Sequence, residues 1–326
     1  MPPFQYRRPA SLEEAVALLQ QPGAQALGGG TDLLPLQREA LAAPEVVVDL
    51  RRLPRSTEVE WLDDGGVRIG ALARLAHLAR NEALREAFPL FAESCAAAGS
   101  EALRTMGTLG GNLCQRPRCW YFRNGFACHK SGGSSCHAAG GENQYHAIFG
   151  NGPCVAVHPS DPAVALTALE AVVHVTGRGG ERDIAIADFY AGAHLPGGHE
   201  TAIAPGEIVT AVTLPAVSRG GVQHFEKVLQ RGAFDFALVS VAAIKRGDGE
   251  VRLVLGGVAS RPWRVTDSIE EDVASGGLSE DDIETLAQRA LYDAAPLGHN
   301  GYKVDIAAGV LERAMRALLH GGAGGA

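Results

Sequence analysis

The stretch AQALGGGTDLLPL, residues 24–36, decides how the N-terminal part of this chain folds. Its apolar beginning, which ends at Leu27, predicts a strand, and the three glycines at positions 28–30 predict a tight loop. Glycine amides have no Cβ beside them, so they can approach a phosphate closely. The pattern differs from G-x-G-x-x-G and from the P-loop with its lysine, so neither of those folds is predicted. A flexible turn is the alternative interpretation of the same residues.

A second glycine-rich stretch, RTMGTLGGNLCQ, covers residues 104–115. It combines Gly107, Gly110 and Gly111 with two small polar residues, Thr108 and Asn112. Two loops of this kind in one domain could clasp a long diphosphate ligand from both sides. This pairing favours a binding site over a flexible turn for both loops.

Five of the six cysteines lie in one stretch of the chain, at Cys114, Cys119, Cys128, Cys136 and Cys154. From Cys119 onward the spacing is C-x8-C-x7-C-x17-C. Structural zinc sites usually contain paired ligands two to four residues apart, and this stretch has no such pair. Four thiolates spread this widely can converge if a loop folds around a larger group, so the spacing favours a 4Fe-4S cluster.

Three other interpretations of the cysteines stay open on spacing alone. Zinc could take mixed ligands from the histidines of the region, His129, His137, His146 or His158. Disulfides would require an oxidising compartment, and the N-terminal sequence has no secretory pattern that predicts one. The cysteines could also carry no metal.

Length and composition set the outer limits. A chain of 326 residues with 46% hydrophobic residues is expected to form two or three domains. A net charge of -8 argues against nucleic acid as the main partner. No apolar run is long enough to predict a membrane span, and Glu13 and Glu14 interrupt the region where an export signal would be apolar.

The remaining sequence predicts a mixture of helices and strands, with a boundary near residues 215–221. Ser11 is expected to cap a helix at 12–19, and Asp161 is expected to cap another helix or to accept from a ribose hydroxyl. Further helices are expected at 75–87, near 91–98, at 281–294 and at 304–319. Strands are expected at 46–50 and 67–71, in the segments EAVVHVTG, ERDIAIADFY and PGEIVTAVTLP, and in a new unit that begins near Gly221.

Taken together, these motifs resemble those of the FAD-binding medium subunit of the molybdenum hydroxylases, the group that contains xanthine dehydrogenase, carbon monoxide dehydrogenase and aldehyde oxidoreductases. The resemblance covers nearly the whole chain, and the motifs occur in the order of that family. They are GGGTDLL at 28–34, MGTLGGN at 106–112, PSD at 159–161, GEIVTAVTLP at 206–215, FEKV at 225–228 with DFALVSVA at 235–242, and LGGVASRPWR at 255–264.

The resemblance implies an α+β fold. Residues 1–217 would form a FAD-binding domain of the vanillyl-alcohol-oxidase (PCMH) type, in two subdomains of about 1–55 and 56–217, with an insertion at about 114–155. Residues 218–326 would form a smaller α+β domain with a three-stranded sheet and helices.

The same resemblance implies roles in FAD binding, while no residue of the chain is expected to be catalytic by itself. Asp161 would hold a polar group of FAD, Ile208 would line the adenine side, and Lys227 would reach from the C-terminal domain toward the isoalloxazine ring. The diphosphate would lie on Gly28, Gly29, Gly30, Thr31, Asp32 and Leu33, with Thr108, Gly111 and Asn112 as the second wall.

The insertion looks like the one in periplasmic-type aldehyde oxidoreductases and in 4-hydroxybenzoyl-CoA reductase, which houses a 4Fe-4S cluster. The segment RCWYFRNGFACHKSGGSSC and the HPSD motif that follows it are closer to the aldehyde oxidoreductase form. By this resemblance Cys114 and Cys95 are not ligands. The implied ligands are Cys119, Cys128, Cys136 and Cys154.

The implied function is electron transfer within a heterotrimer. A large molybdenum-cofactor subunit would oxidise an aldehyde, and electrons would pass through a small 2Fe-2S subunit to FAD. An external acceptor such as a ferredoxin-like protein or a quinone would then take them, with NAD a poor acceptor. The alternatives are the beta subunit of 4-hydroxybenzoyl-CoA reductase and a zinc-stabilised scaffold without redox function. The expected location is the cytoplasm, or the periplasm through co-export with a Tat-signalled partner.

Overall fold

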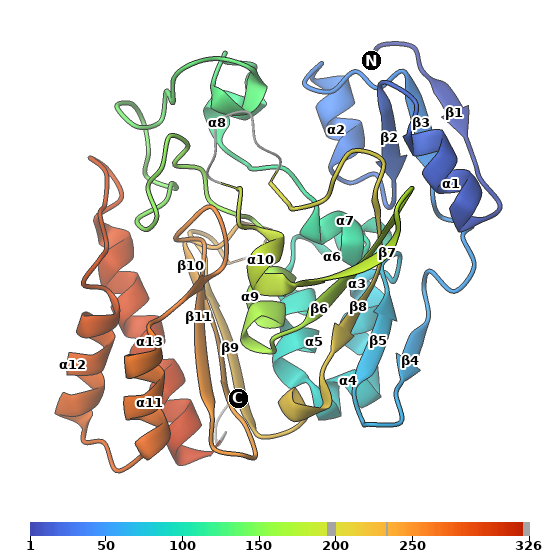
Figure 1. Ribbon diagram of the computed structural model, residues 1–326. Helices are drawn as coiled ribbons and strands as arrows, with labels where there is room; N and C mark the ends of the chain where they lie inside the picture. The colour runs from blue at the N-terminus through green and yellow to red at the C-terminus, as the bar shows by residue number, and fades with distance from the viewer. Residues whose placement is uncertain (194–199, 233, 322–326) are drawn as a thin grey trace.

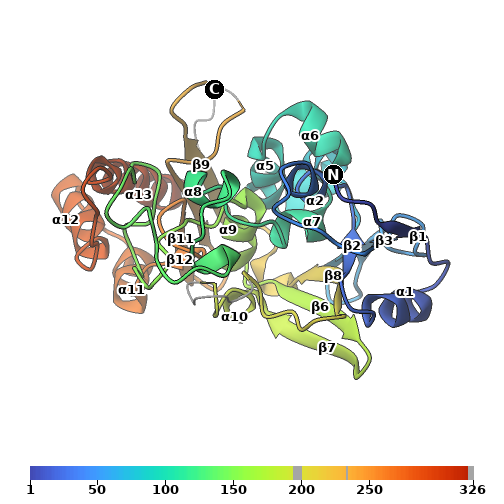
Figure 2. The same ribbon diagram turned by 90° about the horizontal axis from the view of Figure 1, so that it is seen from above.

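The computed structural model describes residues 1–193, 200–232 and 234–321, and it contains three separate β-sheets with helices packed between and around them (Figure 1). The N-terminal sheet and the C-terminal helices lie at opposite sides of the molecule (Figure 2). The α+β fold is therefore confirmed. No helix in these described ranges is long and apolar enough to cross a membrane.

The N-terminal sheet is parallel, with the strand order β1-β3-β2. Its crossover helix, α1, begins after Ser11, whose side chain accepts from the backbone N–H of Glu14, so the predicted cap is confirmed. Ala15, Val16 and Leu19 of α1 are buried on one face. The elements are β1 (Gln5–Arg7), α1 (Leu12–Leu19), β2 (Ala24–Leu27), α2 (Leu33–Arg38) and β3 (Val46–Asp49).

The middle sheet is antiparallel throughout, with the order β4-β5-β8-β6-β7. Its strands are β4 (Val59–Trp61), β5 (Val67–Gly70), β6 (Val172–Gly177), β7 (Gly180–Ala185) and β8 (Ile208–Leu214). The accompanying helices are α3 (Leu75–Arg80), α4 (Glu82–Ala87), α5 (Pro89–Ala97), α6 (Glu101–Met106), α7 (Leu109–Leu113), α9 (Asp161–Ala168), α10 (Ile186–Phe189) and the 3-10 turn η2 (Ala216–Ser218).

Two predicted local features differ here. The single helix expected at 75–87 is two helices, because Asn81 leaves the helical conformation and its side chain caps α4 by accepting from the N–H of Leu84. The cap of α9 is Ser160, whose hydroxyl accepts from the N–H of Ala163 at 3.0 Å. Asp161 is the first helical residue, so its carboxylate is left for another partner.

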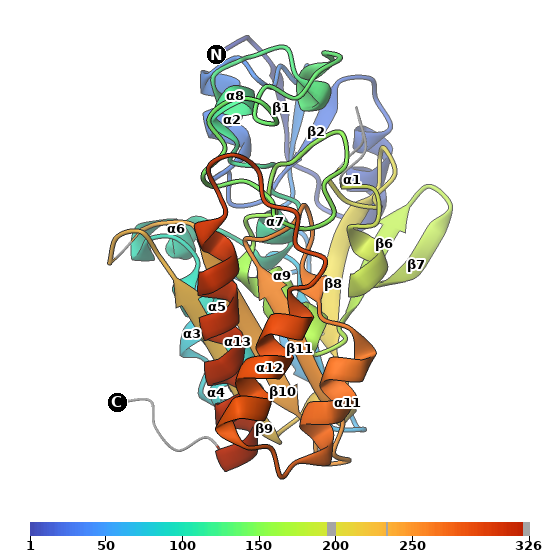
Figure 3. The same ribbon diagram turned by 90° about the vertical axis from the view of Figure 1, so that its left-hand side faces the viewer.

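The C-terminal sheet has the order β12-β11-β10-β9, and its helices cover one face of it (Figure 3). The three expected strands form this sheet together with a fourth strand, β12, whose two residues are too few for a sequence pattern to predict. Helix α11 was not predicted either. The elements are β9 (Val222–Val228), β10 (Val239–Lys245), β11 (Val251–Gly256), β12 (Trp263–Arg264), α11 (Asp267–Ser275), α12 (Glu280–Ala290) and α13 (Tyr302–His320).

Strand β10 contributes to two different hydrophobic cores. Val239, Val241 and Ala243 belong to the core formed with the C-terminal helices. Ala242 and Ile244 point the opposite way, as alternation along a strand requires, and belong to the large core around α5, α9 and the middle sheet. The predicted domain boundary at 217 therefore stays a prediction, because the largest core includes residues from both sides of it.

The insertion at 114–155 contains little regular structure. Its elements are α8 (Trp120–Arg123) and the 3-10 turn η1 (His129–Ser131). In Figure 1 it lies at the top of the molecule, over α9 and β10. Several hydrogen bonds fix it to the connection between α12 and α13, among them Ala295 N to Ile148 O at 2.7 Å and His299 N to Asn143 Oδ1 at 2.9 Å.

Candidate functional site

The two glycine-rich loops meet at one cavity of 680 Å³, called here the glycine cavity. The first loop joins the end of β2 to α2, and Gly30 adopts a φ of +76°, which favours glycine. The second wall comes from the start of α7, where the Thr108 hydroxyl accepts from the N–H of Gly111. The predicted residues that line this cavity are Gly28, Gly29, Gly30, Thr31, Asp32, Leu33, Thr108 and Gly111.

The loops also contact each other, and this contact is a second reason for the glycines. A Cβ at Gly29 would lie 1.9 Å from the carbonyl oxygen of Met106. A Cβ at Gly28 would lie 2.9 Å from Thr108 Oγ1. The loops can therefore approach only when both positions are glycine. The shape of the cavity depends on this close packing, in addition to any contact with a ligand.

Basic residues of the insertion reach the glycine cavity, and the sequence analysis missed them. Arg116 and Lys130 line it together with Glu200, whose carboxylate accepts from Arg116 at 3.1 Å. Asp32 forms ion pairs with Arg118 at 3.0 Å and Arg123 at 2.8 Å. The Asp32 side chain therefore anchors the insertion. The cluster of arginines at 116, 118 and 123 was the signal that could have shown this link.

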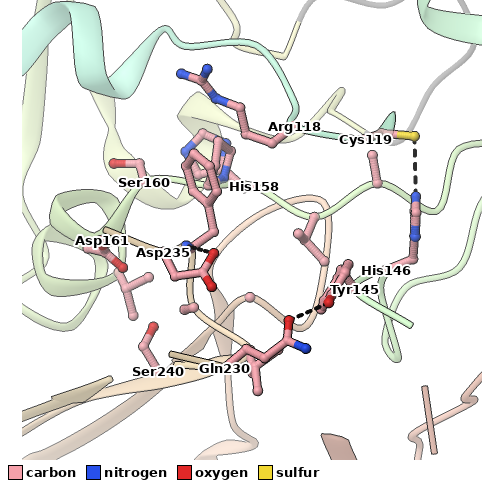
Figure 4. Close-up of a pocket in the computed structure, with 18 of the residues that line it drawn as sticks. Arg118, Cys119, Tyr145, His146, His158, Ser160, Asp161, Gln230, Asp235 and Ser240 are labelled. Carbon is pink, nitrogen blue, oxygen red and sulfur yellow. Dashed lines mark hydrogen bonds between the residues drawn. The ribbon is translucent and has the colours of Figure 1, made fainter. Parts of the chain in front are cut away.

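A second cavity of 360 Å³, called here the ring cavity, lies beside the start of α9 (Figure 4). Asp161 and Ser160 line it. Asp161 forms an ion pair with Lys227 at 2.7 Å, and both side chains are almost fully buried. Burial raises the pKa of Asp161, while the ammonium of Lys227 opposes that shift. Lys227 is therefore a buried counter-ion of Asp161.

Several buried polar atoms in the ring cavity have no hydrogen-bond partner among the described residues. They are Arg118 Nε, His146 Nδ1, His158 Nε2 and Ser240 Oγ. Buried polar atoms are nearly always paired, so their grouping here indicates a site for a ligand with polar atoms. Burial lowers the pKa of His158 to about 3, so this imidazole is neutral. These polar atoms suit a ligand with polar edges, such as the isoalloxazine ring of FAD.

Asn112 links the two cavities. Its neighbour Gly111 lines the glycine cavity, and its own side chain accepts from the hydroxyl of Ser160, which lines the ring cavity. One extended ligand could therefore place a diphosphate in the first cavity and a ring in the second. The donors and the shape of the two cavities fit FAD.

Ile208 lies elsewhere. It is buried in the core between the N-terminal sheet and β8, and it lines a separate cavity of 310 Å³ together with Leu50 and Leu72. Its neighbours Gly206 and Glu207 line the glycine cavity. The structure thus does not bring Ile208 to the glycine cavity with the other predicted residues, and its adenine role stays a prediction.

The four predicted cysteine ligands line one small cavity, called here the cysteine cavity. They are Cys119, Cys128, Cys136 and Cys154, and other residues of its wall include Phe122, Lys130 and Ala156. Cys114 lines the glycine cavity instead, and Cys95 is buried in the large core. These two placements agree with their exclusion as ligands.

The arrangement of the four thiols is unlike a single-ion site. Within the described ranges no three His, Cys, Asp or Glu side chains lie close enough together to hold one metal ion. Yet all four cysteines face the same cavity, and their thiols are near enough to influence one another electrostatically. Four soft thiolates around one space are ligands of the kind that an iron-sulfur cluster takes, and the cluster itself stays a prediction.

Burial and nearby polar groups shift the pKa values of the thiols in opposite directions. Burial raises the pKa of Cys119 to about 11, against hydrogen bonds from the backbone N–H groups of Phe122 and Tyr121. Burial also raises the pKa of Cys154, which the N–H of Ala156 and the charge of Lys130 oppose. These donors and the buried ammonium would stabilise thiolates once a metal group displaced the protons.

The histidines considered as zinc ligands do not form one group. His137 lines the cysteine cavity, but its Nε2 lies 3.2 Å from the carbonyl oxygen of Ala127. His158 lines the ring cavity and packs at a tilt against Tyr190. His129 lines the cysteine cavity, and His146 Nε2 lies 3.2 Å from Cys119 Sγ. The structure does not group them into a mixed zinc site.

Comparison with known proteins agrees with this geometry. A family profile described as the FAD binding domain in molybdopterin dehydrogenase matches residues 2–217. The aldehyde oxidoreductase FAD-binding subunit PaoB of Escherichia coli is 40% identical, over 94% of this chain and 95% of that one. The glyceraldehyde dehydrogenase medium chain of Sulfolobus acidocaldarius is 29% identical, over 88% and 87% of the two chains.

A solved structure shows the same fold. Quinoline 2-oxidoreductase from Pseudomonas putida 86 superposes with a TM-score of 0.77 over 98% of both chains, at 22% sequence identity. The profile, the relatives and the paired cavities agree with one another. The chain therefore belongs to the FAD-binding medium subunits of the molybdenum hydroxylases, a family of oxidoreductase flavoproteins.

Proposed function

We propose that this chain is the FAD- and 4Fe-4S-carrying electron-transfer subunit of a molybdenum-dependent aldehyde oxidoreductase. It would assemble with a large molybdenum-cofactor subunit and a small 2Fe-2S subunit, and pass electrons to an external acceptor. The observation that carries the proposal is the convergence of four insertion cysteines on one cavity next to the ring cavity, with Cys119 and Ala156 lining both. The similarity to the Escherichia coli aldehyde oxidoreductase subunit supports the substrate class.

The glycine loops would hold the diphosphate of FAD. Their backbone N–H groups can approach the phosphates, because no Cβ intervenes at Gly28 or Gly29. Arg116 and Lys130 place positive charge on the same cavity wall. Bound FAD would supply the ability to accept and release electrons, while the protein supplies orientation and electrostatics.

The ring cavity would orient the isoalloxazine group. Ser240 Oγ and His158 Nε2 are unpaired in the described structure, so they are available to polar atoms of the ring. Asp161, which also lines this cavity, is held in place by its ion pair with Lys227. These groups would fix the position of the ring and limit the access of water.

The cysteine cavity would hold the cluster. Cys119, Cys128, Cys136 and Cys154 would be its thiolate ligands, and Phe122 and Ala156 would shield it from water. Lys130 lines both the cysteine and the glycine cavities, so its charge is shared between the two sites. Such buried charge and hydrogen bonding set the potential of an iron-sulfur centre.

Steady-state turnover of the purified complex tests this proposal. We expect aromatic aldehydes to be oxidised with ferricyanide, benzoquinone or a ferredoxin as acceptor, and NAD to be reduced much more slowly. Reduction of 4-hydroxybenzoyl-CoA with a reduced ferredoxin, in the absence of aldehyde turnover, would assign the chain to the alternative enzyme. If NAD were the best acceptor, a role like that of xanthine dehydrogenase would replace the one proposed.

A further inference from the structure

His146 connects the cysteine cavity to the ring cavity. Its Nε2 lies 3.2 Å from Cys119 Sγ, and Figure 4 shows this contact at the edge of the ring cavity. The residue is only 4% exposed, and its side chain lines the ring cavity. Its other ring nitrogen, Nδ1, has no partner within the described part of the chain.

Once Cys119 is a metal-bound thiolate, its contact with His146 decides which ring nitrogen carries the proton. A thiolate at Cys119 is an acceptor only, so an N–H at Nε2 is attractive, whereas a bare lone pair at Nε2 would be repelled. The proton then lies on Nε2, and Nδ1 is left as an acceptor. Since Nδ1 belongs to a residue that lines the ring cavity, it can accept from a group bound there.

The backbone of His146 is held by the start of α13, more than 150 residues later in the sequence. Its carbonyl oxygen accepts from Asn300 Nδ2 at 3.1 Å and from Lys303 Nζ at 3.0 Å. Both side chains are fully buried, and Lys303 also donates to the carbonyl of Gly257. These bonds restrict the position from which the imidazole approaches Cys119. Hydrogen-bonded partners orient the side chains around metal sites in the same way.

We infer that His146 is a positioning residue that donates its Nε2–H to the sulfur of Cys119 and thereby raises the reduction potential of the group bound by the four cysteines. The inference rests on the proposed function, because it requires the cluster. Hydrogen bonds to ligand sulfurs stabilise the more negative, reduced state, and so they raise the potential. No sequence pattern indicates this role, because the sequence suggested His146 only as one possible zinc ligand.

A redox titration of the cluster, followed by its electron paramagnetic resonance signal, tests the inference on the purified full chain. His146→Leu removes the donor, while His146→Gln places an amide N–H near the position of Nε2. His77→Leu is the control, because His77 is an exposed histidine of α3 that lines neither the cysteine cavity nor the ring or glycine cavity. Iron per chain is measured in every variant.

We expect H146L to keep its iron and to show a lower midpoint potential than the wild type, with H146Q closer to the wild type and H77L unchanged. Loss of iron from H146L but not from H146Q would also support the inference, because only H146Q keeps an N–H donor near the sulfur of Cys119. An unchanged midpoint in H146L, or loss of iron in both variants at position 146, would overturn the inference. Absence of iron from the wild-type chain would contradict the cluster assignment itself, which is a separate result.

Discussion

The glycine cavity and the cysteine cavity are built in different ways. The glycine cavity is formed by the end of β2 and the start of α7, where two short loops pack backbone against backbone. The cysteine cavity is formed by an insertion that contains only α8 and η1 as regular elements. The first depends on local backbone geometry, whereas the second depends on side chains and on contacts made by distant parts of the chain.

This difference predicts different responses to change. A substitution in the glycine cavity alters the backbone packing that shapes the site, so it should affect both the fold and the ligand. A substitution in the cysteine cavity should mainly affect the bound metal group and the order of the insertion, because neither α5 nor the middle sheet depends on it. Three experiments can break or sharpen this contrast.

Replacement of a cysteine ligand should have the largest effect. In Cys128→Ser or Cys136→Ser a soft thiolate is replaced by a hydroxyl, so we expect iron to be lost almost completely and the yield of the subunit to fall. Cys95→Ser is the control, because Cys95 is buried in the large core, away from the cysteine cavity. Iron analysis of the purified variants checks this prediction. Iron retained by both ligand variants would contradict the assigned ligand set.

Gly29→Ala should nearly abolish FAD binding. The added Cβ would lie 1.9 Å from the Met106 carbonyl oxygen, so the two loops must separate. Overpacking of this kind costs about 1–3 kcal/mol, and we expect the melting temperature to fall along with the ratio of flavin to protein absorbance. Gly179→Ala is the control, since a Cβ there would meet nothing within 4 Å. Full FAD occupancy in Gly29→Ala would show that the loops do not shape the site.

Replacement of Lys303 should have a smaller effect, which depends on pH and reports on how the C-terminal domain holds the insertion. Burial lowers its pKa to about 7. Above that value the folded chain holds Lys303 neutral while the unfolded chain still protonates it, so stability rises with pH. Between pH 7 and pH 9 Lys303 should raise the free energy of unfolding of the wild type by about 2 kcal/mol. Denaturant unfolding at both pH values should show a smaller rise in the free energy of unfolding for Lys303→Met than for the wild type. An equal rise in the two proteins would contradict the lowered pKa of Lys303.

The sequence predicted much of the glycine cavity and of the helical fold. Ser11 and the helix at 12–19 were predicted correctly, because a cap and an apolar period are local signals. The convergence of the glycine loops followed from two motifs of recognisable chemistry. The break at Asn81 was missed, because the apolar period continues through it and only the cap geometry ends the first helix.

Long-range partners could not be predicted in the same way. The resemblance named Asp161 and Lys227, yet their ion pair joins residues that are 66 positions apart, and no pattern in either segment shows it. The hydrogen bonds from Asn300 and Lys303 to His146 depend on how the C-terminal domain packs against the insertion. Arg116 and Lys130 were not predicted to contribute to the glycine cavity, because only tertiary packing brings both residues to it.

The central claim is that one chain holds FAD in the glycine and ring cavities and a 4Fe-4S cluster in the cysteine cavity. Flavin, iron and zinc analysis of the purified wild-type chain, together with its absorption spectrum, tests this claim most directly. We expect about one FAD and about four iron atoms per chain, with flavin peaks and a broad iron-sulfur absorption beneath them. A chain with FAD but with zinc or no metal in place of iron would contradict the cluster, and a colourless chain would contradict the account as a whole.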